Sequence, residues 1–154
     1  MSYVVEGLDP APYRPLFALS DEQLAERGIV RMTVTGEGFP CRVSLTDRAI
    51  GETMLLLNHV SHDVANPYRA AHAIFVAEAE QDAARYVDQA PPVFRTRVLS
   101  LRGFGRDGMM VDAILTQPGE AKAGIRKLFA NPEIETIHAH NATRGCFLAR
   151  IERN

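Results

Sequence analysis

The chain has 154 residues, of which 46% are hydrophobic and 23% are charged, a composition typical of one globular domain spanning residues 1–154. The formal net charge of −2 gives no basic field for a nucleic-acid partner. The N-terminus does not resemble a secretory signal, and no apolar run is long enough to cross a membrane, so we expect a cytoplasmic protein without a membrane partner. Cys41 and Cys146 are then expected to be reduced, with Cys41 buried and no disulfide between them. The sequence leaves the oligomeric state open.

A short helix is predicted near the N-terminus. Ser20 and Gln23 form a capping-box pattern, and Gly28 suits the position just after a helix. We therefore expect a helix over Asp21–Arg27, preceded by an irregular proline-rich segment at Asp9–Pro15.

Strands are predicted along the rest of the first half of the chain. Before residue 50 the expected strands are Tyr3–Leu8, Ile29–Thr35 and Cys41–Thr46. Two unbroken apolar runs follow, Met54–Leu57 within Glu52–Val60 and Ile74–Val76 within Ala71–Ala77. Such runs are typical of strands buried on both faces, so we expect both to be central in the sheet.

The segment Asn58–Arg69 is polar and is expected to form the longest loop. A helix is expected over Glu78–Gln89, which stops at a pair of prolines. A second helix is expected over Pro118–Ala130, and its apolar stripe should cover one face of the sheet.

A hairpin is predicted between these two helices. Its strands would be Arg95–Phe104 and Met109–Thr116, and the turn would set Arg102 opposite Asp112 as an ion pair. The order of strands and helices is not a regular alternation. The sequence therefore predicts an α+β fold, a single domain with a mostly antiparallel β-sheet and about three helices.

The terminal stretch Ile134–Ile151 is predicted to form a second hairpin with its turn at residues 141–145, so that His140 opposes Cys146. Side chains alternate between the two faces of a strand. The face expected to enter the core carries Ile137, Ala139, Phe147, Ala149 and Ile151. The opposite face would carry Thr136, His138, His140, Cys146, Leu148 and Arg150.

This second face suggests a pocket for a small anionic or polar molecule, because guanidinium and imidazole groups bind carboxylates and phosphates. The candidate lining residues are Arg42, Arg69, Tyr68, His138, His140, Asn141 and Cys146. Other arginines at strand ends or on polar faces are Arg97, Arg102, Arg144 and Arg150. The alternative is a non-catalytic interaction or structural module, in which these arginines pair locally and the histidines lie at the sheet rim.

Two kinds of chemistry remain as further alternatives. His138, His140 and Cys146 could bind zinc, with Cys41, His59 or His62 as a fourth ligand, but the spacing matches no known zinc motif. No cofactor is therefore expected, and zinc remains the alternative. Either thiol could act as a nucleophile, although no signature of a cysteine-enzyme family is present. No glycine-rich loop for nucleotide phosphates is present either.

Short stretches along nearly the whole chain resemble one known family. They are Gly7–Pro10, Leu16–Leu19, Pro40–Leu45, Gly51-Glu52, Leu55–Leu57, Pro67–Arg69, Ile74–Val76, Leu99–Arg102, Gly108–Met110, His138–Asn141 and Gly145-Cys146. On these stretches the chain resembles DUF1203, a small bacterial family known as a domain of unknown function. The resemblance implies a single-domain bacterial protein and transfers no catalytic residue.

Overall fold

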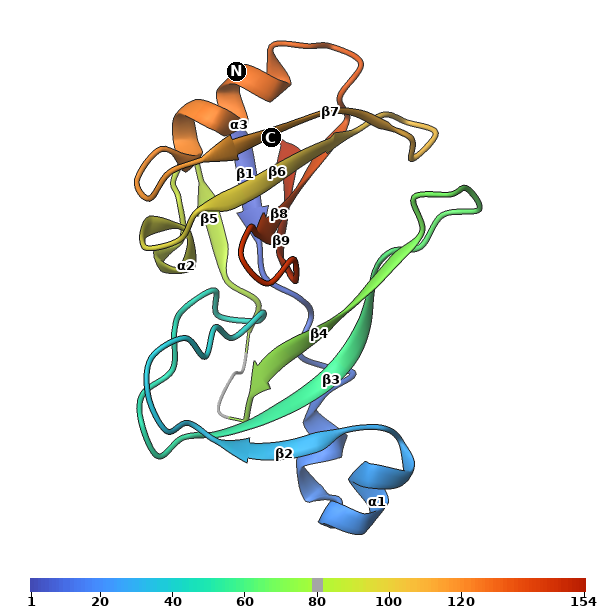
Figure 1. The fold of residues 1–154 in the computed structure, drawn as a ribbon, viewed down its shortest axis with the longest axis vertical. Coiled ribbons are helices and arrows are strands. Elements are labelled where there is room, and N and C mark those ends of the chain that lie inside the picture. The colour runs from blue at the N-terminus through green and yellow to red at the C-terminus, as the bar shows by residue number, and fades with distance from the viewer. Residues whose placement is uncertain (79–81) are drawn as a thin grey trace.

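The strands form two sheets, as Figure 1 shows for the computed structural model of the chain, which describes residues 1–78 and 82–154. The larger sheet has the strand order β5-β1-β9-β8-β6-β7. Its strands are β1 (Tyr3–Glu6), β5 (Arg85–Val87), β6 (Leu99–Phe104), β7 (Met110–Thr116), β8 (Thr136–Asn141) and β9 (Phe147–Arg153). The smaller sheet has the order β2-β3-β4, with β2 (Val30–Thr33), β3 (Thr53–His62) and β4 (Ala70–Ala77).

The helices are short and lie outside the sheets. They are α1 (Asp21–Glu26), α2 (Pro92–Arg95) and α3 (Ala121–Phe129), together with the 3₁₀ helix η1 (Arg14–Ala18). The paired strands run antiparallel to one another in both sheets. The predicted α+β class, with mostly antiparallel strands and about three helices, is therefore confirmed.

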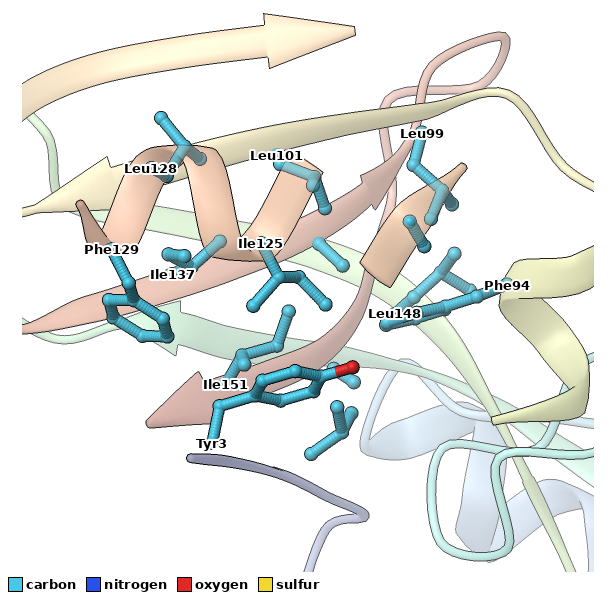
Figure 2. Close-up of a cluster of buried hydrophobic side chains, with 14 of the residues drawn as sticks. Tyr3, Phe94, Leu99, Leu101, Ile125, Leu128, Phe129, Ile137, Leu148 and Ile151 are labelled. Carbon is cyan, nitrogen blue, oxygen red and sulfur yellow. The ribbon is translucent and has the colours of Figure 1, made fainter. Parts of the chain in front are cut away.

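Helix α3 covers one face of the larger sheet, as expected. Its apolar side chains Ile125, Leu128 and Phe129 are buried against the strands (Figure 2). The helix approaches the sheet closely at Gly124, where a Cβ atom would lie 2.4 Å from Thr116 Cγ2 and 2.9 Å from Leu101 Cδ1. Glycine is therefore required at this position, because any side chain would push the helix off the sheet.

The hairpin of β3 and β4 covers part of the other face of the larger sheet. In Figure 1 its tip reaches toward the turn between β6 and β7. The His62 Nε2 atom lies 2.8 Å from the carbonyl oxygen of Gly108, and Asn66 Nδ2 donates to the carbonyl oxygen of Asp107 at 3.1 Å. Each sheet thus contributes one wall to the space between them.

Several local predictions are confirmed. Ser20 and Gln23 form both hydrogen bonds of a capping box at the start of α1, and Gly28 follows that helix with a φ of +70°. The run Met54–Leu57 lies on β3, which is central in the smaller sheet. Cys41 and Cys146 are both free, and Cys41 is fully buried.

The prediction that Ile74–Val76 lies on a central strand is wrong, because β4 is an edge strand of the smaller sheet. The run is nevertheless buried, with Ile74 0% and Val76 1% exposed. The loop before β3 covers this edge, since the backbone N–H of Arg42 donates to the carbonyl oxygen of Phe75 at 3.0 Å. An unbroken apolar run reports burial on both faces, which a covering loop can provide as well as a neighbouring strand.

The predicted strand Cys41–Thr46 is a series of turns with isolated bridges. The alternation of this segment indicates its buried side chains correctly, because Cys41, Val43 and Leu45 are 0% exposed. The backbone, however, turns back on itself, with Leu45 at a φ of +56° and its N–H bonded to the carbonyl oxygen of Cys41 at 2.9 Å. This compact segment fills the space between the sheets.

Two segments differ from the expected helix and loop. The helix expected over Glu78–Gln89 is wrong for residues 82–89, which contain strand β5, whereas residues 79–81 lie outside the described part. The loop expected at Asn58–Arg69 is shorter, because β3 continues through His62. Helix α3 begins at Ala121, three residues after the predicted Pro118.

The register of the two predicted hairpins also differs from expectation. Arg102 lies opposite Ala113 rather than Asp112. In the terminal hairpin, His140 lies opposite Phe147 rather than Cys146, and the register shifts at the next pair. This β-bulge leaves one extra residue, Leu148, on β9.

Candidate functional site

All five histidines of the chain gather between the two sheets. His138 and His140 lie two residues apart on β8, so the pleat directs both rings to the face opposite α3. His59 and His62 on β3 and His72 on β4 meet them from the covering hairpin. Ring centroids are 5.0 Å apart for His62 and His138, and 4.9 Å apart for His72 and His140. We call these five residues the histidine layer.

Two phenylalanines fill the histidine layer. The ring of Phe104 lies 4.9 Å from that of His138, and the ring of Phe147 lies 5.7 Å from that of His59. Phe147 reaches this face because of the bulge in β9, whereas Leu148 enters the core beneath α3. The expectation that Phe147 packs in that core is therefore wrong.

The histidines of β8 are buried rather than placed at a rim, since each is 2% exposed. Burial lowers the pKa of His138 to about 3, and the neighbouring His62 and His140 lower it further. Burial also lowers the pKa of His140 to about 4, although its hydrogen bond to the carbonyl oxygen of Gly145 partly opposes that shift. Both rings are therefore neutral near pH 7.

The pKa values of His59 and His72, two partly buried histidines of the covering hairpin, shift in the same direction. Burial lowers the pKa of His59 and of His72, and the positive charge of Arg42 contributes to both shifts. The Nδ1 atom of His72 lies 3.1 Å from the Ser61 hydroxyl. Burial and nearby arginines thus disfavour positive charge on His59, His72, His138 and His140.

Arg42 is the largest charged side chain buried between the sheets, at 2% exposure. Its guanidinium donates to the carbonyl oxygens of Phe147 at 2.8 Å and Pro40 at 2.6 Å, and to Cys146 Sγ at 3.2 Å. Burial lowers its pKa, and the contact with Cys146 partly offsets that shift. Among the described residues Arg42 makes no ion pair with a carboxylate.

Arg42 lines a cavity of about 660 Å³, which we call the arginine pocket. Three arginines come together here although they are far apart in the sequence. The lining residues are Glu37, Gly38, Pro40, Arg42, Leu56, His72, Ala73, Phe75, Arg97, Asn141, Arg144 and Cys146.

A larger cleft of about 910 Å³, which we call the histidine cleft, opens on another side of the histidine layer. His59, His62 and His138 line it together with Phe147. Its other lining residues are Leu8, Val60, Ser61, Asp63, Val64, Ala65, Gly105, Arg106, Asp107, Gly108, Glu135, Thr136, Arg150, Glu152 and Arg153.

The structure divides the residues that were expected to share one pocket. Arg42, Asn141 and Cys146 line the arginine pocket, and His138 lines the histidine cleft. His140 packs between the two cavities, with its ring 4.9 Å from His72 and 5.8 Å from Phe147.

Tyr68 and Arg69 line neither cavity and lie near the tip of the β3–β4 hairpin. Arg69 is paired with Asp63 at 3.1 Å, and both side chains are exposed. These two residues therefore do not line one cavity with Arg42. Sequence reasoning missed His72, whose signal is that it is the only polar residue within the apolar strand β4.

The thiols and histidines are not arranged as a metal centre. The rings of His138 and His140 are 6.4 Å apart, and Cys146 Sγ accepts a hydrogen bond from Arg42. Cys41 Sγ accepts backbone N–H groups of Val43 at 3.4 Å and Ala77 at 3.3 Å. In residues 1–78 and 82–154 no group of three or more His, Cys, Asp or Glu residues could hold a metal ion.

The comparison with protein families agrees with the resemblance noted in the sequence. No helix in the described part of the chain has the length and apolar character needed to cross a membrane. None of the curated proteins and none of the solved structures compared with the chain matches it. The family described as "Protein of unknown function (DUF1203)" matches residues 38–153, which include the lining residues of both cavities except Leu8 and Glu37. The chain belongs to the DUF1203 family.

Proposed function

We propose that the protein binds a small anionic molecule, a carboxylate or a phosphate, in the arginine pocket. The observation that carries the proposal is the buried Arg42 guanidinium, which makes no ion pair with any carboxylate of the described residues. Burying an unpaired charge is costly, and its pKa is lowered accordingly. An anion bound in the pocket would supply the missing opposite charge.

The other two arginines differ in what they can offer to an anion. Arg97 donates to Asp47 through both terminal nitrogens, at 2.8 Å and 2.5 Å, so its charge is already balanced. Arg144 lies exposed in the turn before β9 and makes no ion pair with a described residue. Arg144 is therefore the second residue that we assign to the ligand. Its position on a turn lets its side chain move toward a bound anion.

The remaining walls indicate the body of the ligand. Leu56, Ala73 and Phe75 add apolar surface to the lining that carries the arginines. Asn141 adds an amide that can donate or accept a hydrogen bond. A flat or branched apolar group that carries one anionic head fits this lining, since such pockets are mostly apolar with a few polar anchors.

Calorimetric titration with benzoate, at low ionic strength and pH 7, tests the proposal. We expect the wild-type protein to bind benzoate. Arg144→Gln should weaken binding about tenfold, which corresponds to the loss of roughly one charge-assisted hydrogen bond, and Arg42→Gln should abolish binding. Arg69→Gln is the matched control, because it removes the same charge from the hairpin tip. Equal weakening by Arg69→Gln, or unchanged binding in Arg144→Gln, would mean that benzoate is not held in this pocket.

A second candidate function, an interaction module, is supported by strand β7. This strand forms an edge of the larger sheet and exposes Leu115 at 68% and Val111 at 37%. Unpaired edges with apolar side chains can pair with another strand, here that of a second copy. Light scattering should then show a dimer that Leu115→Lys dissociates, whereas a wild-type monomer at high concentration would exclude self-association through β7.

A further inference from the structure

The ring of His138 in the histidine layer, like that of His59, has no hydrogen bond to another described residue. Its neighbours have hydrogen-bond contacts, since His62 meets the carbonyl oxygen of Gly108 and His140 that of Gly145. The His138 residue is only 2% exposed, yet its ring nitrogens are not among the fully buried atoms without a partner in the described part of the chain, so they open toward the histidine cleft that the residue lines. A ring nitrogen that faces a cleft and has no partner in the protein can bond a molecule in that cleft without losing another hydrogen bond.

The ring of His138 is held in a fixed orientation. It packs edge-on against Phe147 at 5.5 Å and His62 at 5.0 Å, and obliquely against Phe104 at 4.9 Å. These contacts make it a preformed element of the histidine cleft, which His59 also lines.

The occupant suited to this cleft is uncharged. Because burial keeps His138 neutral down to a pKa of about 3, its ring offers one N–H donor and one lone pair rather than a positive charge. Arg150 is paired to Glu152 at 2.6 Å and Arg106 to Glu135 at 3.5 Å, and the other charged lining residues are Asp63, Asp107 and Arg153. The cleft therefore lacks the excess positive charge that distinguishes the arginine pocket.

We propose that the histidine cleft is a second binding site, separate from the arginine pocket, and that it takes a planar uncharged amide, with His138 as the hydrogen-bonding anchor. An amide carries both a donor and an acceptor, so it can bond either tautomer of the ring. The rings of Phe147 and His59, with centroids 5.7 Å apart, provide apolar faces for the body of the ligand.

A matched pair of probes tests the proposal by NMR titration at pH 7. Benzamide and benzoate have the same ring and nearly the same size, and differ in charge. We expect benzamide to shift the backbone amides of residues 59–62 and 136–138 and the ring nitrogens of His138. Benzoate at the same concentration should leave these signals unchanged, whatever it does at the arginine pocket.

The variant His138→Phe keeps a ring between its aromatic neighbours and removes both nitrogens. We expect it to weaken benzamide binding about tenfold or more, the usual effect of losing a hydrogen bond to a buried group. Unchanged affinity in this variant, or no response of the His138 nitrogens in wild type, would overturn the proposal and leave only solvent in the cleft. If the variant does not fold, the response of the wild-type nitrogens alone decides. Failure of benzoate to bind anywhere would count against the arginine pocket only.

Discussion

Lowering the pH from 7 to 5 should destabilise the fold through the two buried histidines of β8. Their pKa values are about 3 for His138 and about 4 for His140 in the folded chain, against 6.5 for a histidine in water. A group whose folded pKa is depressed in this way binds more protons when unfolded. Stability is therefore fully present above pH 6.5 and is lost progressively as the pH falls toward 4 and then 3.

The size of the loss follows from linkage. Each such histidine lowers the free energy of unfolding by about 1.4 kcal/mol per pH unit once the unfolded state is protonated, so each costs about 2 kcal/mol at pH 5. The pair together should cost about 4 kcal/mol, a large part of the stability of a domain of this size. The carboxylates of Glu52 and Asp88 have lowered pKa values, so their contribution fades only at lower pH.

Urea denaturation at half-unit steps from pH 7.5 to 4.5 measures this dependence. The double variant His138→Phe/His140→Phe serves as the reference, because phenylalanine keeps a ring at each position and cannot take up a proton. We expect the free energy of unfolding of wild type to fall relative to the variant between pH 6.5 and 5, with the steepest slope near pH 5. Parallel curves for the two proteins would refute the conclusion that both rings are buried and neutral.

Three further substitutions test the packing, each by denaturant melts at pH 7. Phe147→Ala should cost about 3–5 kcal/mol, because the ring is 2% exposed within the histidine layer; a loss under about 1 kcal/mol would place the ring in solvent. His140→Ala should cost about 1–3 kcal/mol, since the residue is equally buried, whereas a change within about 0.5 kcal/mol would restore the expectation of a rim histidine. Gly7→Ala should leave little folded protein, because its Cβ would lie 1.9 Å from the carbonyl oxygen of Val43, and a cooperative melt near that of wild type would contradict that geometry.

Local patterns in the sequence predicted burial and local structure well. The capping box of Ser20 and Gln23 was identified because its hydrogen bonds join residues three apart. The alternation of β8 placed His138 and His140 on one face, because a strand allows no other arrangement. The same alternation at residues 41–46 indicated buried side chains correctly, but said nothing of the turns in the backbone that carries them.

The features that were missed depend on contacts between distant segments. A single extra residue, Leu148, changed which side chains of β9 face the histidine layer, and no composition signal marks a bulge of this kind. The contact of His62 with Gly108 spans 46 residues, so the docking of the β3–β4 hairpin could not be inferred from either segment alone. The same docking separated Arg69 from Arg42, which the sequence had grouped by residue type.

That docking also explains why one protein has two cavities of opposite character. The β3–β4 hairpin buries the histidines of β8 and so keeps them neutral. The histidine cleft is therefore lined by the uncharged ring of His138. On the side of Cys146 the buried residue is an arginine, whose guanidinium stays charged far more readily than an imidazole. The two proposed ligands therefore differ in charge for one physical reason. Equal burial neutralises a histidine but leaves an arginine in need of an anion.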